Sequence, residues 1–505
     1  MERSQWGTRA GFILAAVGSA IGLGNIWRFP YVAYDNGGGA FIVPYLIALF
    51  TAGIPILIME FTMGHKYRGS APLTFSRIHK KSEAVGWFQV FVSFGISTYY
   101  AVIIGWALAY SFYAFNLSWG DDTGGFLMGE YLKAGDVGAV GSFVPSVLIP
   151  LLVVWAVVLA FLFKGVKKGI EVANRIFIPT LVVLFLIIVI RAVTLPGAGD
   201  GLDALFTPDW SQLGNAKVWT AAYTQIFFSL SICFAIMITY SSYLPKKSDI
   251  TNNAFITGLG NSGFELLAGI GVFSAIGFIA YATESAVGNY AADGVGLAFA
   301  VFPQIINEMP FLNGVFGFLF FASLVLAGIT SLISICETFI AAFQEKFNIT
   351  RGKAVAVGGG LSALISLIYA TEGGVHFLTA VDRYVLTVGV GLGGLIQVLV
   401  LAWALRKVKD FKEHADGLSQ IKLGSWWTIC LTVITPVLLG YMIVQQLIDD
   451  FTAPYVDGYP LSLIGPWGMG ALGLVIVLAL IFTAFKWKPG LVESESVNAD
   501  KEVSG

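Results

Sequence analysis

Long, continuously apolar segments recur along the chain, and short polar stretches separate them. Each segment is long enough for a helix that crosses a bilayer, which takes about 20 apolar residues. The segments lack the alternation of apolar and polar residues that is typical of barrel strands. The pattern therefore predicts an all-α polytopic membrane protein with about 12 transmembrane helices, over residues 10–35, 38–64, 84–117, 146–164, 171–193, 219–242, 256–283, 312–346, 353–370, 376–403, 425–446 and 463–486.

The composition supports a membrane protein and excludes a soluble one. The 505 residues are 56% hydrophobic and only 12% charged, whereas a soluble domain carries about 25% charged residues. The net charge of −2 provides no field that would recruit nucleic acid. The cysteines have no spacing that indicates a disulfide framework; they are Cys233, Cys336 and Cys430.

Basic residues gather in alternate connections between the predicted spans. Lysines and arginines are frequent around residues 66–81, 164–168 and 406–412, and the other set of connections holds only Lys133, Arg191 and Lys217. Cytoplasmic loops carry such an excess of Lys and Arg. We therefore expect a multi-pass protein of the cell inner membrane, surrounded by the lipid bilayer, with both termini in the cytoplasm.

Two spans contain helix-weakening residues near their middle. Residues 18–25 of the first span read GSAIGLGN, and residues 229–234 of the sixth read SLSICF. Carbonyls freed by unwinding within a membrane protein can bind a cation, and half-helix N-termini can bind an anion. The breaks lie five spans apart, which points to an inverted repeat. Gly18 and Gly22 are equally consistent with a simple helix-packing face.

Other polar residues lie inside the spans. Thr330 and Ser331 are adjacent hydroxyls in the eighth span, where they either bond back to the preceding turn or complete an ion site with the first span. Ionisable side chains are costly in lipid and are functional hypotheses by default; they are Arg28, Glu60, Glu265, Glu337 and Asp382. Arg28 and Asp382 have opposite charges, so a functional pair and a purely structural pair are both open. The four histidines lack a metal-binding spacing and no nucleophile motif occurs, so we expect no enzyme.

Residues 18–45, GSAIGLGNIWRFPYVAYDNGGGAFIVPY, resemble the first-span signature of the neurotransmitter:sodium symporter family, which has the LeuT fold. VWTAAYTQIFFSLSICF, NSGFE, AGITS and the aspartate of LTAVDRY continue the resemblance through spans six, seven, eight and ten. It implies a 5+5 inverted repeat with broken helices 1 and 6. The implied organisation is a cytoplasmic segment with inner-gate residues (1–9), a ten-helix transport core (10–403), two additional helices (404–488) and a disordered cytoplasmic tail (489–505).

The resemblance implies two sodium sites built from oxygen ligands. The first would consist of Ala20, Asn25, Ser229 and Asn261. The second would use carbonyls of Gly18, Ile21 and Ala327 with the hydroxyls of Thr330 and Ser331. Ligands that are all oxygen suit a hard monovalent cation, and the second set agrees with the pairing of spans one and eight inferred above.

The resemblance also implies a substrate site and two gates. The substrate site would contain Ser19, Ala20, Leu23, Gly24, Ile96, Tyr100, Phe228, Ser229, Ser231, Phe234, Ser331 and Ile335. Tyr100 would donate its hydroxyl to a substrate carboxylate. The outer gate would pair Arg28 with Asp382 beneath the lid of Phe234. The inner gate would combine Arg3, Trp6, Tyr243 and Glu345, where the family more often has aspartate at the last position.

Departures from the family pattern narrow the function. Amine transporters carry aspartate where Gly22 stands, so the substrate is expected to bring its own carboxylate. Chloride-dependent animal members have serine where Glu265 stands, so this acid would substitute for chloride and no chloride requirement is expected. Cys233 and Ala235 stand where glycines often flank the phenylalanine, which leaves the pocket volume open.

We therefore expect a sodium-coupled symporter that takes up neutral hydrophobic L-amino acids by alternating access. The alternatives are a narrower substrate such as tyrosine or a small osmolyte, a ligand receptor that does not transport, or an ion channel. The sequence sets neither the sodium stoichiometry, nor proton counter-transport, nor the oligomeric state.

Overall fold

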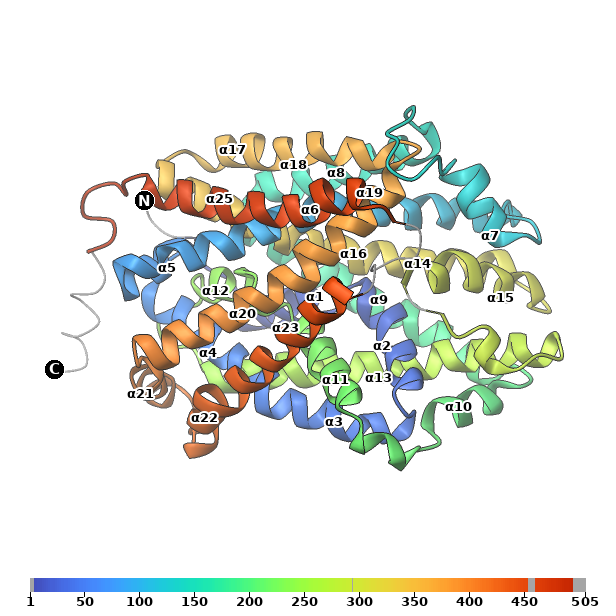
Figure 1. The fold of residues 1–505 in the computed structure, drawn as a ribbon, viewed down its shortest axis with the longest axis horizontal. Coiled ribbons are helices and arrows are strands. Elements are labelled where there is room, and N and C mark those ends of the chain that lie inside the picture. The colour runs from blue at the N-terminus through green and yellow to red at the C-terminus, as the bar shows by residue number, and fades with distance from the viewer. Residues whose placement is uncertain (1–3, 293, 453–458, 494–505) are drawn as a thin grey trace.

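The computed structural model describes residues 4–292, 294–452 and 459–493. In these ranges the chain is helical, and its only strand-like pairings are isolated bridges between Gly38 and Pro208 and between Phe143 and Thr371. Figure 1 shows most long helices running along the horizontal axis. At one end of the bundle lie α5 (Ala71–Ile78) and α21 (Val408–Leu418), and at the other lie α7 (Thr123–Gly125), α10 (Ala198–Phe206) and α15 (Phe302–Glu308). The predicted all-α class is confirmed.

The first half of the bundle extends to the fifth span and the connection that follows it. Its helices are α1 (Arg9–Ala20), α2 (Leu23–Asp35), α3 (Ile42–Ala48), α4 (Ile54–Tyr67), α5 (Ala71–Ile78), α6 (Glu83–Tyr113), α7 (Thr123–Gly125), α8 (Pro145–Gly165), α9 (Glu171–Val193) and α10 (Ala198–Phe206). Short 3-10 and π-helical turns join several of them, including the π-helical turn Val166–Ile170 between α8 and α9.

The second half begins with the sixth span. Its helices are α11 (Ala216–Ser229), α12 (Ile236–Ser241), α13 (Ile250–Ala282), α14 (Gly294–Gly296), α15 (Phe302–Glu308), α16 (Asn313–Phe347), α17 (Arg351–Ala354), α18 (Gly360–Ser366), α19 (Gly374–Val381), α20 (Gly391–Val398), α21 (Val408–Leu418), α22 (Ser425–Ile429), α23 (Thr435–Thr452), α24 (Leu461–Leu463) and α25 (Gly470–Ala484).

The helices of the described ranges account for all twelve predicted spans. Nine continuous helical stretches are long and apolar enough to cross a membrane, and α1 with α2 forms a tenth span bent by 53°. One stretch, Pro145–Val193, has 49 residues, which is about 74 Å of helix and more than twice the hydrocarbon thickness. Gly165 interrupts it at φ +85°, so it holds the predicted fourth and fifth spans. The pair α11 and α12 supplies the remaining span.

Both predicted breaks are present. Only Ile21 and Gly22 separate α1 from α2, whereas the six residues 230–235 separate α11 from α12. Three residues of this longer loop have left-handed backbone angles although none is glycine: Ser231 at φ 52°, Cys233 at 70° and Ala235 at 69°. Non-glycine residues are costly in this region, so the surrounding contacts must hold the loop in place.

Burial divides the spans into a centre and a periphery. In the most apolar window of the span around α6, 83% of residues are buried inside the protein, and in that of α16 the share is 72%. The share falls to 33% for the span of α22 and α23 and to 17% for that of α24 and α25. The last two spans therefore turn most of their surface outward. The hydrogen bonds that form the candidate site join α1, α2, α6, α11, the loop after α11, α13 and α16.

Candidate functional site

The breaks of spans one and six meet α13 through a chain of side-chain hydrogen bonds. The Asn25 amide donates to Asn261 Oδ1 at 2.8 Å, and the Asn261 amide donates to Ser229 Oγ at 3.1 Å. The backbone N–H of Gly22 donates to Asn25 Oδ1 at 2.9 Å. The fold thus brings together three residues predicted for the first sodium site, and Ala20 ends α1 two residues before Gly22.

Carbonyl oxygens of the first break converge on a hydroxyl of α16. The Oγ atom of Ser331 lies 3.3 to 3.4 Å from three carbonyl oxygens, those of Gly18, Ser19 and Ile21. The side chain is buried. One hydroxyl proton cannot serve three acceptors, so this buried cluster is rich in oxygen lone pairs, which is the chemistry that a hard cation such as sodium requires.

Thr330 makes the contact expected of a hydroxyl within a helix. Its Oγ1 atom donates to the carbonyls of Ala327 at 3.0 Å and Leu326 at 3.2 Å. This is the ordinary bond to the preceding turn. It also places the hydroxyl beside the Ala327 carbonyl, another oxygen predicted for the second sodium site, so the oxygen set of this site fits a sodium ion.

The N-terminus of α2 faces two hydroxyls. The N–H of Leu23 donates to the Tyr100 hydroxyl at 3.3 Å. A Cβ atom on Gly22 would lie 3.1 Å from the Tyr100 hydroxyl and 3.2 Å from Ser331 Oγ, whereas one on Gly24 would meet no atom within 4 Å. A helix N-terminus favours an anion, and here it lies next to a hydroxyl donor and free space.

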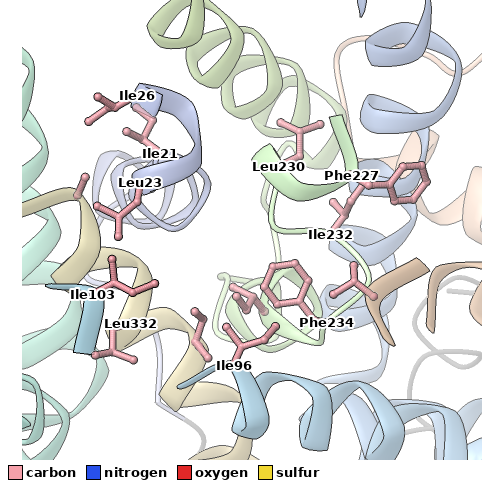
Figure 2. Packing of buried hydrophobic residues seen from close by; sticks show 14 of the residues in the cluster. Ile21, Leu23, Ile26, Ile96, Ile103, Phe227, Leu230, Ile232, Phe234 and Leu332 are labelled. Atoms are coloured by element: carbon pink, nitrogen blue, oxygen red, sulfur yellow. The ribbon is translucent and has the colours of Figure 1, made fainter. Parts of the chain in front are cut away.

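Apolar side chains from separate spans adjoin these polar groups. Figure 2 shows Leu23 of α2, Ile96 of α6, Phe234 of the loop before α12 and Leu332 of α16 gathered in one buried cluster. The loop is fixed there because Ser93 Oγ donates to the Phe234 carbonyl at 2.5 Å. Two predicted substrate residues not labelled in Figure 2, Ile335 and Ser231, are also buried, and Ser231 Oγ donates to the Ser19 carbonyl at 2.8 Å.

The predicted outer-gate residues lie on α2 and at the start of the π-helical segment Asp382–Val390. The Arg28 guanidinium lies over the Phe228 ring, 4.6 Å from its centroid. The Asp382 carboxylate lies close to the Tyr99 hydroxyl. The pairing of Arg28 with Asp382 stays a prediction.

The predicted inner-gate residues Trp6 and Tyr243 are in direct contact. The backbone N–H of Trp6 donates to the Tyr243 carbonyl at 3.1 Å, and its indole N–H donates to the Tyr240 carbonyl at 2.8 Å. Glu345 accepts a hydrogen bond from the Ser70 N–H at 2.9 Å, at the start of α5. Arg3 lies outside the described residues.

A buried ion pair adjoins the residues predicted for the inner gate. The Tyr243 hydroxyl donates to Glu337 Oε1 at 2.8 Å, and the Arg351 guanidinium binds both Glu337 oxygens at 2.9 and 2.7 Å. Arg351 also donates to the Leu162 carbonyl of α8 at 2.8 Å. The sequence marks Glu337 only as a charge inside a span, and Arg351 reads as an ordinary basic residue at a span end.

A second buried network supports the break in span six. Glu60 Oε1 accepts the Cys233 N–H and the Gln397 amide, both at 2.9 Å, and Gln89 donates to Gln397 Oε1 at 2.6 Å. Glu60, Gln89 and Gln397 are fully buried. The sequence marks Glu60 as a charge inside a span and shows two glutamines within apolar spans, but it does not identify their partners.

Glu265 lies one helical turn beyond Asn261 and is fully buried. It accepts hydrogen bonds from the Tyr45 hydroxyl and, at 2.6 Å, from the Gln225 amide. Its carboxylate also lies beside the Ser229 hydroxyl. The acid is therefore next to the residues predicted for the first sodium site.

Comparisons with known proteins agree with this geometry. A model of the sodium:neurotransmitter symporter family matches residues 3–133 and 124–488. An uncharacterized sodium-dependent transporter of Methanocaldococcus jannaschii is 40% identical over 96% of this chain and 98% of its own length. A sodium- and chloride-dependent GABA transporter of Drosophila melanogaster is 31% identical over 90% of this chain and 52% of its own length.

A solved structure shares the fold. The crystal structure of MhsT in complex with L-phenylalanine has a TM-score of 0.76 and 33% identity, and the match covers 88% of this chain and 100% of that one. The broken first and sixth helices, the twelve spans and these matches confirm the resemblance noted in the sequence and exclude an enzyme. The chain therefore belongs to the sodium:neurotransmitter symporter family of secondary transporters.

Proposed function

We propose that the protein couples the inward movement of sodium to the uptake of neutral hydrophobic L-amino acids by alternating access. The observation that carries the sodium coupling is the convergence of the Gly18, Ser19 and Ile21 carbonyls on Ser331 Oγ. We assign one sodium ion to this cluster and a second to Asn25, Ser229 and Asn261. We also propose an inner-membrane location with both termini in the cytoplasm.

The surroundings of Gly22 support an amino acid substrate. A carboxylate at the N-terminus of α2 would receive the Tyr100 hydroxyl, the Gly24 N–H and the sodium ion at Asn25. The ammonium group would find the Ser231 hydroxyl and carbonyls of the two breaks. Ile96, Phe234 and Ile335 are apolar and buried, which favours an aliphatic or aromatic side chain. MhsT was crystallised with L-phenylalanine, which supports the same class.

Coupling requires that sodium and substrate favour the occluded state together. A carboxylate that ligates the first sodium ion makes each affinity depend on the other by the same factor. Either ligand can shift the conformational equilibrium only through its different affinity for the two states. The residues of the first break serve both ligands, so they are the point at which this coupling would arise.

Glu265 supports chloride independence. A fixed carboxylate beside Ser229 supplies the negative charge that a chloride ion would otherwise bring to the first sodium site. We expect transport to continue when gluconate replaces chloride, and Glu265→Ser to make transport responsive to chloride. A chloride requirement of the wild-type protein would contradict this assignment.

The test measures uptake of labelled leucine and phenylalanine into proteoliposomes under a sodium gradient. In the negative control, potassium replaces sodium. Ser331→Ala with Thr330→Val is expected to weaken sodium-dependent binding about tenfold or more, or about 1.4 kcal/mol. Ser323→Ala is the matched control, because Ser323 lies on the same helix, is fully buried, and bonds back to the Phe320 carbonyl at 2.6 Å. Unchanged sodium dependence in the folded double variant would refute the second sodium site.

A further inference from the structure

A cavity of about 430 Å³ lies where the N-terminal segment meets the hairpin of α8 and α9. Its lining includes three basic side chains, those of Lys167, Lys168 and Arg175. All three are exposed. None of the residues predicted for the sodium sites or the substrate site lines this cavity.

The one acid in the cavity is already engaged. Glu171 accepts hydrogen bonds from the Gly7 N–H at 2.6 Å and from the Thr8 hydroxyl at 2.9 Å, one to each carboxylate oxygen. Among the described residues, Lys167, Lys168 and Arg175 make no ion pair. The three basic groups outnumber the single acid, so the cavity carries a net positive charge.

Another group of lysines in the inner connections differs in this respect. On α21 and at the residue before it, each lysine has an acid three or four residues away: Lys407 with Asp410 at 3.7 Å, Lys409 with Glu413 at 3.8 Å and Lys412 with Asp416 at 2.7 Å. Each of these three lysines thus has an acid partner nearby in the sequence, although Asp410 also binds Lys66. The α8–α9 cluster therefore differs from α21 in having no acid that balances its lysines.

The surface beside the cavity is apolar and faces outward. Phe163 of α8 is 51% exposed, and Val172 and Ile176 of α9 are 41% and 56% exposed. Exposed apolar side chains of a spanning hairpin contact acyl chains, and basic pockets at the cytoplasmic surface bind lipid headgroups. Unbalanced positive charge and lipid-facing apolar surface occur here at the same membrane boundary.

We propose that this cavity binds the phosphate headgroup of an anionic phospholipid, whose acyl chains lie along the outer surface of α8 and α9. Lys167, Lys168 and Arg175 bind the phosphate, and Glu171 keeps the N-terminal segment beside it. The Lys167 side chain packs against Gly7, because a Cβ atom on that glycine would lie 3.0 Å from Lys167 Cε. Gly7 follows Trp6 of the inner gate, so the bound lipid steadies the segment that closes the gate.

The test is native mass spectrometry of the purified full-length protein titrated with phosphatidylglycerol or phosphatidylcholine. The variant replaces Lys167, Lys168 and Arg175 together by glutamine. Each basic residue near an anionic surface contributes about a fivefold gain in affinity, so we expect the first phosphatidylglycerol to bind about a hundredfold more weakly to this variant. The matched control replaces Lys407, Lys409 and Lys412 by glutamine, and its affinity should change by about twofold at most because these charges are already paired.

A second measurement follows deuterium uptake of residues 6–12 in nanodiscs. Uptake should be slower in an equal mixture of phosphatidylglycerol and phosphatidylcholine than in phosphatidylcholine alone, and the difference should vanish in the triple variant. Equal phosphatidylglycerol binding by the triple variant would overturn the proposal, and so would an equal loss in the α21 control. Competition by inorganic phosphate as strong as that by the lipid would assign the cavity to a soluble anion instead. If the triple variant does not fold, Arg175→Gln alone should still bind phosphatidylglycerol about fivefold more weakly.

Discussion

Replacing Glu337 by glutamine should loosen the predicted inner gate. Glutamine keeps one oxygen for the Tyr243 hydroxyl but loses the charge and one of the two oxygens that bind Arg351. Glu337 is fully buried and the Arg351 side chain is 18% exposed, so solvent screens the pair only weakly. A hydrogen bond to a charged group contributes about 1.5 to 3 kcal/mol, and removing one partner of a buried pair costs about 3 to 5 kcal/mol.

Part of this loss affects all conformations equally. The part specific to the closed gate is the contact between Glu337 and Tyr243 together with the Arg351 anchor to α8. We take about 2 kcal/mol as the differential loss, which is about a thirtyfold shift of the equilibrium away from the closed inner gate. The expected result is faster hydrogen exchange in residues 6–20, with weaker sodium-dependent amino acid binding.

The assay is hydrogen exchange by mass spectrometry, with substrate and sodium present. Glu83→Gln is the matched control, because Glu83 forms another buried pair, 2.5 Å from Lys346, and hydrogen-bonds to Trp87 and Trp487 rather than to Tyr243. Tyr243→Phe should be non-additive with Glu337→Gln, since the first variant removes the hydrogen bond between these two side chains and the second weakens it. Unchanged exchange in residues 6–20 of a folded, substrate-binding Glu337→Gln protein would refute the reasoning.

Three further predictions concern the loop of span six, the substrate and the response to acid. Ala235→Gly should leave the melting temperature unchanged or raise it, because glycine tolerates φ 69°. The control Ala222→Gly, inside α11, should lower the melting temperature by the equivalent of about 1 kcal/mol. A lower melting temperature for Ala235→Gly would contradict the strain argument. Tryptamine should compete with a bound hydrophobic amino acid about a thousandfold less well than tryptophan does. It lacks the carboxylate, so it leaves the Tyr100 hydroxyl and one face of a sodium ion unpaired, a loss of roughly 4 kcal/mol. Equal competition by the two molecules in a binding assay would exclude the carboxylate argument. Burial lowers the pKa of His414 from 6.5 to about 4, and the charges of Lys66 and Arg68 outweigh the opposing effect of Asp410. As the pH falls, the unfolded chain therefore takes up a proton at this histidine before the folded protein does. The free energy of unfolding should fall, by about 3 kcal/mol at most, as the pH drops from 6.5 to 4. Thermal unfolding should show this loss, and His414→Gln should reduce it; an equal acid sensitivity in that variant would assign the effect to other groups.

The spans and the position of the first break were predictable because both depend on local composition. Apolar length sets a span, and Gly18, Gly22 and Gly24 weaken a helix wherever they occur in it. The break in span six was harder to predict, since its left-handed positions are Ser231, Cys233 and Ala235 rather than glycines.

The partners of the buried polar groups were not predictable in the same way. Gln397 contacts Glu60 across 337 positions of sequence, and Tyr243 contacts Glu337 across 94. A single sequence shows that such a group needs a partner in lipid, but only the packing of the helices selects which one. For Glu337 and Arg351 the charges were visible and their pairing was not.

The support of the span-six loop also constrains how the protein is made. An unwound segment cannot satisfy its own backbone in lipid, and this loop receives its support through Glu60, which is synthesised before it, and Gln397, which is synthesised after it. A nascent chain that has reached span six therefore lacks one of the groups that fix the loop. Until the tenth span has entered the membrane, the sixth span therefore has to adopt another conformation, in which its backbone groups form hydrogen bonds within the segment. Unwinding is then one of the last steps of biogenesis, and a chain truncated before Gln397 should be recognised by quality control as unfinished even though its first nine spans are complete.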